Sequence, residues 1–185
     1  MDCTNCTYDK ICRKTETCKA TSFEPEEAIR KYAAEPEIVQ AAAELVDFGR
    51  AGTLSRLQEI VEFSKKMNYR RIGLAYCYGM EKQVQQIAGI IRSNGLNVRA
   101  VLCTVGGISQ NEVNPESSFC TVSCNPIGQA MQMNSEKVDL VLMVGLCLGH
   151  DILFQREVKA DCTTLVVKDR VHNHAPLKAL ESDSK

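Results

Sequence analysis

No stretch of this sequence is long and apolar enough to cross a membrane, since its apolar runs stop far short of the ~20 residues that a membrane helix requires. Residues 1–20 do not resemble a secretory leader either, because they are polar and rich in cysteine. Charge of one sign is also lacking. With 22 basic and 23 acidic side chains, the net charge of −1 gives no electrostatic basis for binding nucleic acid or an anionic membrane. We therefore expect a soluble, cytoplasmic protein.

The common nucleotide-binding motifs are absent as well. The chain contains neither a Gly-x-Gly-x-x-Gly fingerprint nor a Walker A motif, which argues against an ordinary NAD or ATP enzyme. Tryptophan is missing and aromatic residues make up only 5%, but ten of the 185 residues are cysteine. Because cytosolic thiols are kept reduced, so many cysteines indicate a metal, an iron–sulfur cluster or catalytic sulfur before they indicate disulfides.

The chain divides into three stretches. Residues 1–20 form a Cys-rich, metal-binding segment with almost nothing apolar to bury, so that a metal would have to supply the free energy of folding. Residues 21–68 are predicted to be a helical lead packed on the core, with helices beginning near Pro25, near Pro36 and after Thr53 or Ser55. Residues 69–185 form the remaining domain.

That third stretch alternates short apolar runs with helical patterns. Strands are predicted at residues 72–77, 98–103, 138–144 and 163–167, and helices lie between them. Such alternation is typical of right-handed crossovers and a parallel sheet that is covered on both faces. We therefore predict an α/β fold: a small Rossmann-like three-layer domain with a mainly parallel sheet of about four strands, preceded by the Cys-rich loop and the N-terminal helices.

Four cysteines lie before the fold begins. Cys3, Cys6, Cys12 and Cys18 place four thiols within sixteen residues. Four thiolates suit tetrahedral Zn²⁺, and the same set suits a cubane iron–sulfur cluster. We slightly favour the iron–sulfur cluster, because all four ligands belong to one short polar loop; zinc stays open, and disulfide pairing is the structural alternative.

A second set of cysteines follows the strands. Cys77 and Cys103 end the first two strands, Cys124 immediately precedes a helix at Pro126, and Cys147 enters the helix after the third strand. Since ligands bind at the carboxyl edge of open parallel sheets, these four thiols are predicted to share one site, which could hold a second metal or cluster. A helix N-terminus would lower a thiol pKa there. The alternative is that they are core filler, as buried cysteines often are and as we expect for Cys162.

Other polar residues are expected at the same edge. Cys147 is the candidate nucleophile or ligand, and His150 is its candidate acid/base partner or co-ligand. Residues of the loop after the second strand and of the segment after the fourth are candidates for binding a cofactor or ligand, and they comprise Gly106, Gly107, Asp169, Arg170 and His174. All three histidines of the chain fall at this edge.

Several of these stretches resemble a known family. They are Ile72–Cys77, Cys124–Ile127, Val144–Asp151, Val166–Val171 and the four N-terminal cysteines. Over nearly its whole length the chain is similar to the prokaryotic domain-of-unknown-function family 1847, whose members are described as metal-binding. The resemblance implies a metal at the N-terminal cysteines, prokaryotic and often anaerobic hosts, and no assigned reaction. Residues at its recurrent motif positions are Cys77, Cys124, Cys147, His150, Asp151, Asp169, Arg170 and His174. This chain departs from the family pattern after Cys103, where Thr104 and Val105 stand in place of a further thiol.

Two classes of function stay open. In the first, the N-terminal centre lies next to a Cys/His-lined crevice at the strand ends and the protein carries out redox or thiol/metal chemistry with a redox partner protein. In the second, the N-terminal site is structural zinc and the crevice binds a small anionic ligand through Gly106, Gly107 and Arg170, with no catalysis. Docking of the N-terminal helices on a partner, including homodimerisation, is a further alternative.

Overall fold

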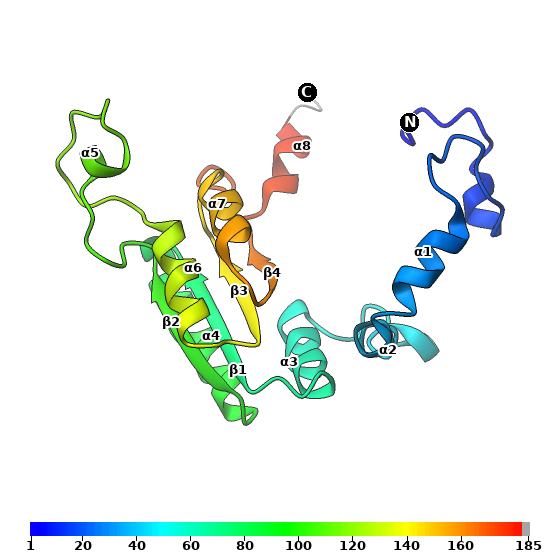
Figure 1. Cartoon of the computed structure of the whole chain (residues 1–185), viewed down its shortest axis with the longest axis horizontal. Coiled ribbons are helices and arrows are strands. Elements are labelled where there is room, and N and C mark those ends of the chain that lie inside the picture. The colour runs from blue at the N-terminus through cyan, green and yellow to red at the C-terminus, as the bar shows by residue number, and fades with distance from the viewer. Residues whose placement is uncertain (183–185) are drawn as a thin grey trace.

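The computed structural model describes residues 1–182, and a four-stranded sheet forms its centre (Figure 1). The strands occur in the order β2-β1-β3-β4, and every neighbouring pair is parallel. Their bounds are Arg71–Tyr76 for β1, Asn97–Leu102 for β2, Leu140–Val144 for β3 and Asp161–Val166 for β4. The predicted Rossmann-like α/β fold is thereby confirmed, and each predicted strand lies within two residues of its observed bounds.

Helices cover both faces of the sheet, which gives three layers. One apolar core joins the sheet to α3 and α4, and the other joins it to α6 and α7. These helices span Arg56–Lys66 (α3), Glu81–Ser93 (α4), Pro126–Ser135 (α6) and His150–Glu157 (α7). The central strand β3 is buried at all five positions, because it has a strand on each side and helices above and below. Short helices α5, Gln110–Val113, and α8, Ala179–Ser182, lie outside these layers.

Local signals fix where the helices begin. Ser55 closes a capping box with Gln58 ahead of α3, and the Asn125 side chain accepts a hydrogen bond from the Gly128 N–H at the start of α6. Pro126 occupies the first turn of α6, where its missing N–H is not needed. The sequence pattern predicted both helix starts, and α6 carries Cys124 on the segment that leads into it.

The N-terminal arm, which we define as residues 1–50, extends away from the sheet (Figure 1). It contains α1, Pro25–Tyr32, and α2, Pro36–Ala43, and α1 has no buried residue. α3 does pack on the core through Ile60. The structure therefore departs from the expectation that all of residues 21–68 pack on the core, because α1 has no apolar partner surface in this arrangement. Within residues 1–182, no helix is long and apolar enough to cross a membrane.

Candidate thiol site at the carboxyl edge of the sheet

Strand pairing aligns the ends of the three neighbouring strands, and this alignment gathers the cysteines that follow them. Tyr76, the last residue of β1, is in register with Leu102 of β2 and with Val144 of β3. The ladder continues one residue further, because the Cys77 N–H donates to the Val144 carbonyl at 3.2 Å and the Cys103 N–H donates to the Tyr76 carbonyl at 2.9 Å. Cys77 and Cys103 are both 3% exposed.

Cys124 is brought to the same place by its neighbour. The Asn125 N–H donates to the Cys103 carbonyl at 2.6 Å, so that the segment leading into α6 lies against the end of β2. The Cys124 thiol then donates to the Cys103 sulfur at 3.7 Å. Cys103 also accepts from the Tyr78 N–H at 3.4 Å and interacts as a donor with the sulfur of Cys77. Three thiols from three segments therefore form one row of contacting sulfurs, in the order Cys124, Cys103, Cys77. We call this row the thiol chain.

A lysine terminates this chain of sulfurs. Lys168, two residues beyond β4, places its Nζ 3.2 Å from the Cys77 sulfur. Burial opposes ionisation of Cys77, but this effect is outweighed by hydrogen bonds from the Gly79 N–H, from Lys168 and from the Cys103 thiol, and by the positive charge of Lys168. The net result is a lowered pKa for Cys77. A buried cysteine whose pKa is lowered beside a lysine is a candidate for chemistry rather than for core filler.

The other two cysteines of the thiol chain, Cys103 and Cys124, have raised pKa values. Burial raises the pKa of Cys103 to about 12, with the Tyr78 N–H opposing the shift and the charges of Cys124 and Cys77 adding to it. Burial also raises the pKa of Cys124, and the charges of Cys147 and Cys77 add to this shift while the contact with Cys103 and the charge of Arg170 oppose it. The site therefore places one thiol of lowered pKa, Cys77, next to two thiols of raised pKa, Cys103 and Cys124.

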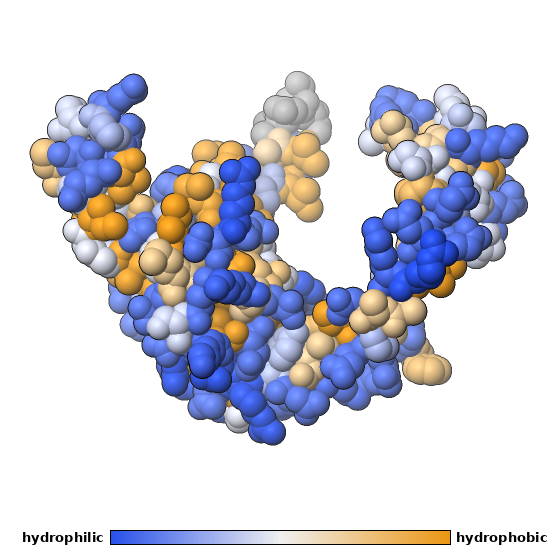
Figure 2. Space-filling view, viewed as in Figure 1, coloured by the Kyte–Doolittle hydropathy of each residue, from blue (hydrophilic) through white to orange (hydrophobic). Residues whose placement is uncertain are grey.

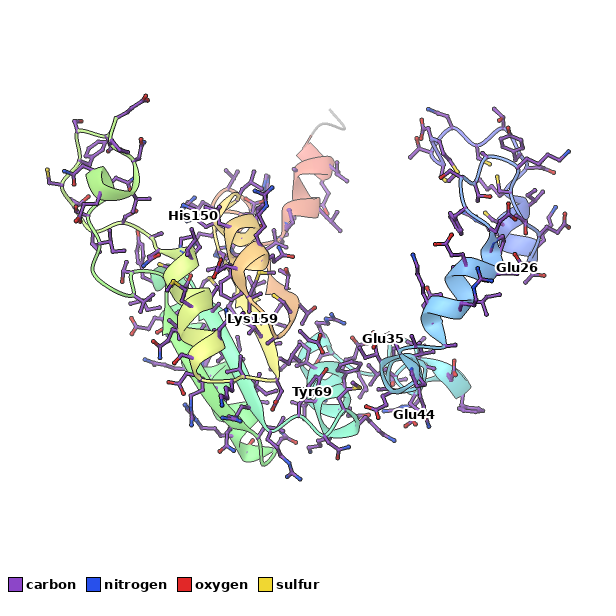
Figure 3. All side chains as sticks on the ribbon, viewed as in Figure 1. Glu26, Glu35, Glu44, Tyr69, His150 and Lys159 are labelled. Atoms are coloured by element: carbon purple, nitrogen blue, oxygen red, sulfur yellow. The ribbon has the colours of Figure 1, made fainter. Side chains whose placement is uncertain are left out.

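Cys147 meets an arginine rather than the expected histidine. Its sulfur accepts a hydrogen bond from the Arg170 guanidinium at 3.2 Å, and this contact and the thiolate charge raise the pKa of Arg170. The N–H of His150 donates to the Cys147 carbonyl at 2.9 Å, as in a first helical turn. Figure 3 shows His150 at the start of α7, at the carboxyl edge. Among the side-chain hydrogen bonds of residues 1–182, none joins His150 to Cys147.

The remaining predicted binding residues shape the loops around the thiols. Asp169 accepts from the Val171 and His172 N–H groups, which together with the His172 ring lower its pKa, and its own N–H donates to the His174 ring. Asp169 and His174 therefore hold their own turn. Gly106 and Gly107 have positive φ angles of 86° and 62°, which let the loop after β2 turn back toward the cap of α6.

The four N-terminal cysteines gather around one hollow. Cys3, Cys6, Cys12 and Cys18 all line a cavity of about 400 Å³ in the arm. Hydrogen bonds from the backbone N–H groups of Tyr8 and Lys10 lower the pKa of Cys6. Four soft sulfur donors around one cavity fit a thiolate metal centre in their chemistry. Their sulfurs do not close around a point, since no group of three His, Cys, Asp or Glu in residues 1–182 has the spacing to hold an ion.

We expected the two cysteine sets to lie next to each other, but they are far apart in the structure. The arm stands across a wide opening from the carboxyl edge of the sheet (Figures 1 and 2). The reason is that residues 1–32 bury no apolar side chain that could hold them against the sheet. Cys120 is exposed in the long loop. Cys162 lies at the opposite edge, where burial raises its pKa to about 11.

Sequence reasoning did not assign a role to Lys168. The signal was present, because this lysine follows an apolar strand and therefore falls at the carboxyl edge. What the sequence does not state is which of the clustered cations, Lys168 or Arg170, meets which sulfur. The pairing of β4 with β3 determines this. The Gly145 N–H donates to the Val166 carbonyl at 2.8 Å, and two residues further along the chain Lys168 contacts the Cys77 sulfur.

Comparison with known proteins gives a family and a relative. The model of a family described as "Protein of unknown function (DUF1847)" matches residues 12–165. The chain is 37% identical over 180 residues to "Uncharacterized protein MJ0455" of Methanocaldococcus jannaschii, covering 94% of this chain and 90% of the relative. No solved structure matches. The matched range of the family model contains the whole thiol chain but ends before Lys168.

Proposed function

The chain belongs to the family of proteins of unknown function DUF1847, and because that family lends it no reaction, we propose from its own residues that it is a thiol–disulfide redox protein. Its substrate is a disulfide, carried by a partner protein or by a small molecule. The working residues are Cys124 and Cys103, which supply the two electrons, and Cys77 with Lys168, which supplies a base.

One observation carries this proposal: the hydrogen-bonded order Cys124, Cys103, Cys77, Lys168. Because the pKa of Cys77 is lowered and those of Cys103 and Cys124 are raised, a proton can pass inward along these sulfurs once Cys77 has ionised. Of the three cysteines of the thiol chain, Cys124 is the most accessible, whereas Cys77 and Cys103 are buried. The thiolate, not the thiol, is the attacking species in disulfide exchange, so a base linked to the accessible thiol is the feature that exchange requires.

The proposed exchange begins with two proton transfers along the thiol chain. The Cys77 thiolate takes the proton of Cys103 as Cys103 takes that of Cys124, which leaves Cys124 as a thiolate. Cys124 attacks one sulfur of the incoming disulfide, forms a mixed disulfide and releases the other sulfur as a thiolate. That thiolate takes the proton of Cys103, and Cys103 then attacks the Cys124 sulfur. A Cys103–Cys124 disulfide forms, and the second substrate sulfur leaves and takes the proton now on Cys77.

Oxidation of the full chain by a small aromatic disulfide tests the proposal. We expect loss of two hydrogens in a disulfide that links Cys103 to Cys124, identified by proteolysis and mass spectrometry of the unreduced protein, and release of two thiols from the reagent. The sulfurs already lie 3.7 Å apart, so that the bond needs only a small movement of either side chain. Peptides from residues 1–20 are scored separately. Oxidation that leaves Cys103 and Cys124 both alkylatable would overturn the proposal.

We also propose that the N-terminal cysteines bind a thiolate-ligated metal, either an iron–sulfur cluster or zinc. The shared cavity and the lowered pKa of Cys6 support this assignment. Such a centre would tie down a segment that buries no apolar residue, and an iron–sulfur cluster would in addition exchange electrons.

Replacing Cys6 with Ser is expected to lower the bound metal roughly tenfold, since one ligand of four is lost. Metal and acid-labile sulfide are measured on protein purified without oxygen, together with a visible spectrum. Cys120→Ser is the matched control, because Cys120 is an exposed loop thiol outside the cavity, and it should keep the metal. Iron with sulfide would assign a cluster, and zinc alone would assign a structural ion. Native protein with no metal would contradict this part of the proposal.

A further inference from the structure

The arm exposes large apolar side chains that the rest of its own chain does not cover. Ile29 and Tyr32 on α1 are 63% and 65% exposed, and Phe48, in the turn that ends the arm, is fully exposed. Ile29 and Tyr32 lie three residues apart on α1, and Tyr32 lines a hollow together with Ile38 and Val39 of α2. An exposed apolar surface rimmed by charge commonly marks an interface. Figure 2 shows the arm and the sheet domain as two separate masses joined at one end.

A second exposed apolar surface lies at the carboxyl edge of the sheet. We define the rim as Leu148, Val171 and Leu177, whose exposures are 87%, 84% and 76%. Leu148 follows Cys147 along the chain, and Val171 follows Arg170. Leu148 and Val171 lie in turns and Leu177 lies in a short 3-10 helix, Pro176–Lys178. These side chains contribute little to the stability of the fold, because each is largely in solvent.

The two surfaces carry opposite charge. Residues 24–47 of the arm contain seven acidic and two basic side chains, and Figure 3 shows Glu26, Glu35 and Glu44 spread along this part. Residues 168–178, which supply most of the rim, contain three Lys or Arg, one Asp and two of the three histidines. An acidic arm with apolar side chains is therefore complementary to a basic, apolar rim, and such complementarity gives an interface its register.

The arm is held away from the rim of its own chain. Arg50 donates to the Glu44 carbonyl at 2.9 Å and pairs with Glu62 of α3 at 2.6 Å, and Lys66 of α3 pairs with Glu44. These interactions fix the end of α2 on α3. Because α3 packs on the sheet through Ile60, the end of α2 is held beside the sheet domain, and α1 extends beyond it (Figure 1). A rim that the arm of the same chain does not reach is left for the arm of another.

We infer that two copies of this chain form a dimer by exchanging arms, each arm resting on the rim of the other copy. Two-fold symmetry satisfies both surfaces at once, since arm-to-rim contact made in one direction is repeated in the other and the assembly closes. This pairing goes beyond the thiol chemistry and does not depend on it.

The test measures the mass of the full chain in solution as a function of concentration, by light scattering and sedimentation. The native protein should be a dimer. Ile29→Lys with Tyr32→Lys removes apolar area and acidic character from the arm, and Val171→Glu with Leu177→Glu makes the rim acidic. Each double variant is expected to raise the dimer dissociation constant roughly tenfold or more. Ile90→Lys is the control: Ile90 is 45% exposed on α4, away from both surfaces, and the dimer should persist.

Mixing the two double variants separates arm exchange from other dimers. Alone, either variant lacks both arm-to-rim contacts, but a mixed pair regains one intact contact, from the native arm of the rim variant to the native rim of the arm variant. We therefore expect the mixture to dimerise more tightly than either variant alone. A native protein that is monomeric at every concentration, a dimer that both double variants leave unchanged, or a mixture no tighter than its components would overturn the inference.

Discussion

Replacing Cys103 with Ser is expected to abolish disulfide formation at the carboxyl edge of the sheet and to stop exchange at its first step. Cys103 is the middle sulfur of the chain, so its loss removes the thiol that resolves the mixed disulfide on Cys124. A small disulfide should then leave a stable adduct on Cys124, where the native chain forms an internal disulfide and releases both substrate thiols. Intact mass and peptide mapping after a timed quench distinguish the two products.

The fold should survive this change. Exchanging a buried thiol for a hydroxyl costs about 1–3 kcal/mol in the free energy of unfolding, which thermal melting of the variant would show. Cys103→Ala removes the same sulfur without adding a polar group and should give the same adduct more slowly, because it also breaks the proton path from Cys124 to Cys77. The matched control is Cys162→Ser, which alters a cysteine of the opposite edge and should leave exchange unchanged. An internal disulfide in Cys103→Ser that joins Cys77 to Cys124 would contradict the proposed order.

Replacing Lys168 with Met is expected to slow exchange at neutral pH by roughly tenfold, the change in ionised fraction that a rise of about one unit in the pKa of the base Cys77 would give. Methionine keeps an apolar stem of similar length beside Gly79 and Gly145 but removes the charge that faces the Cys77 sulfur at 3.2 Å. The pKa of Cys77 then rises, because burial is no longer offset by the ammonium group. The rate of thiol release from a chromogenic disulfide measures the effect.

The pH dependence of the exchange rate tests the role of Lys168 separately from the size of the rate change. In the native protein, the rate should rise with pH through the pKa of Cys77, which is lowered from its ordinary value. In Lys168→Met the same rise should occur at higher pH, so that the two proteins converge in alkali. Since the folded pKa of Cys77 is lowered, its ionisation stabilises the fold above the unfolded pKa, and this contribution is lost as pH falls through the folded pKa.

A second lysine serves as the control for this experiment. Lys159 is exposed in the turn between α7 and β4, at the opposite end of β4 from Lys168 (Figure 3). Lys159→Met removes the same charge from the surface, and both the rate and its pH profile should stay as in the native protein. An unchanged profile in Lys168→Met would mean that Cys77 does not act as the base, and the proton path would have to be abandoned.

The local pattern of the sequence was enough to predict the fold. Each strand is a short apolar run followed by a helix, and only a parallel sheet covered on both faces can use that order. The same rule predicted that Cys77, Cys103, Cys124 and Cys147 would come to one edge, because residues that follow parallel strands must do so. The starts of α3 and α6 were equally predictable, since Ser55 and Asn125 cap them by bonds that span three residues.

Contacts between elements were decided only by the tertiary structure. The order of the sulfurs, the pairing of Lys168 with Cys77 and the preference of Cys147 for Arg170 over His150 depend on which strand lies beside which, and on register to within one residue. The position of the arm was likewise outside the reach of the pattern. Its helices have apolar faces that would suit the sheet, yet α1 buries no residue and α2 buries Ala41. Periodicity shows that a face is apolar, and only the packed structure shows what that face contacts, because burial is a property of the neighbours and not of the residue.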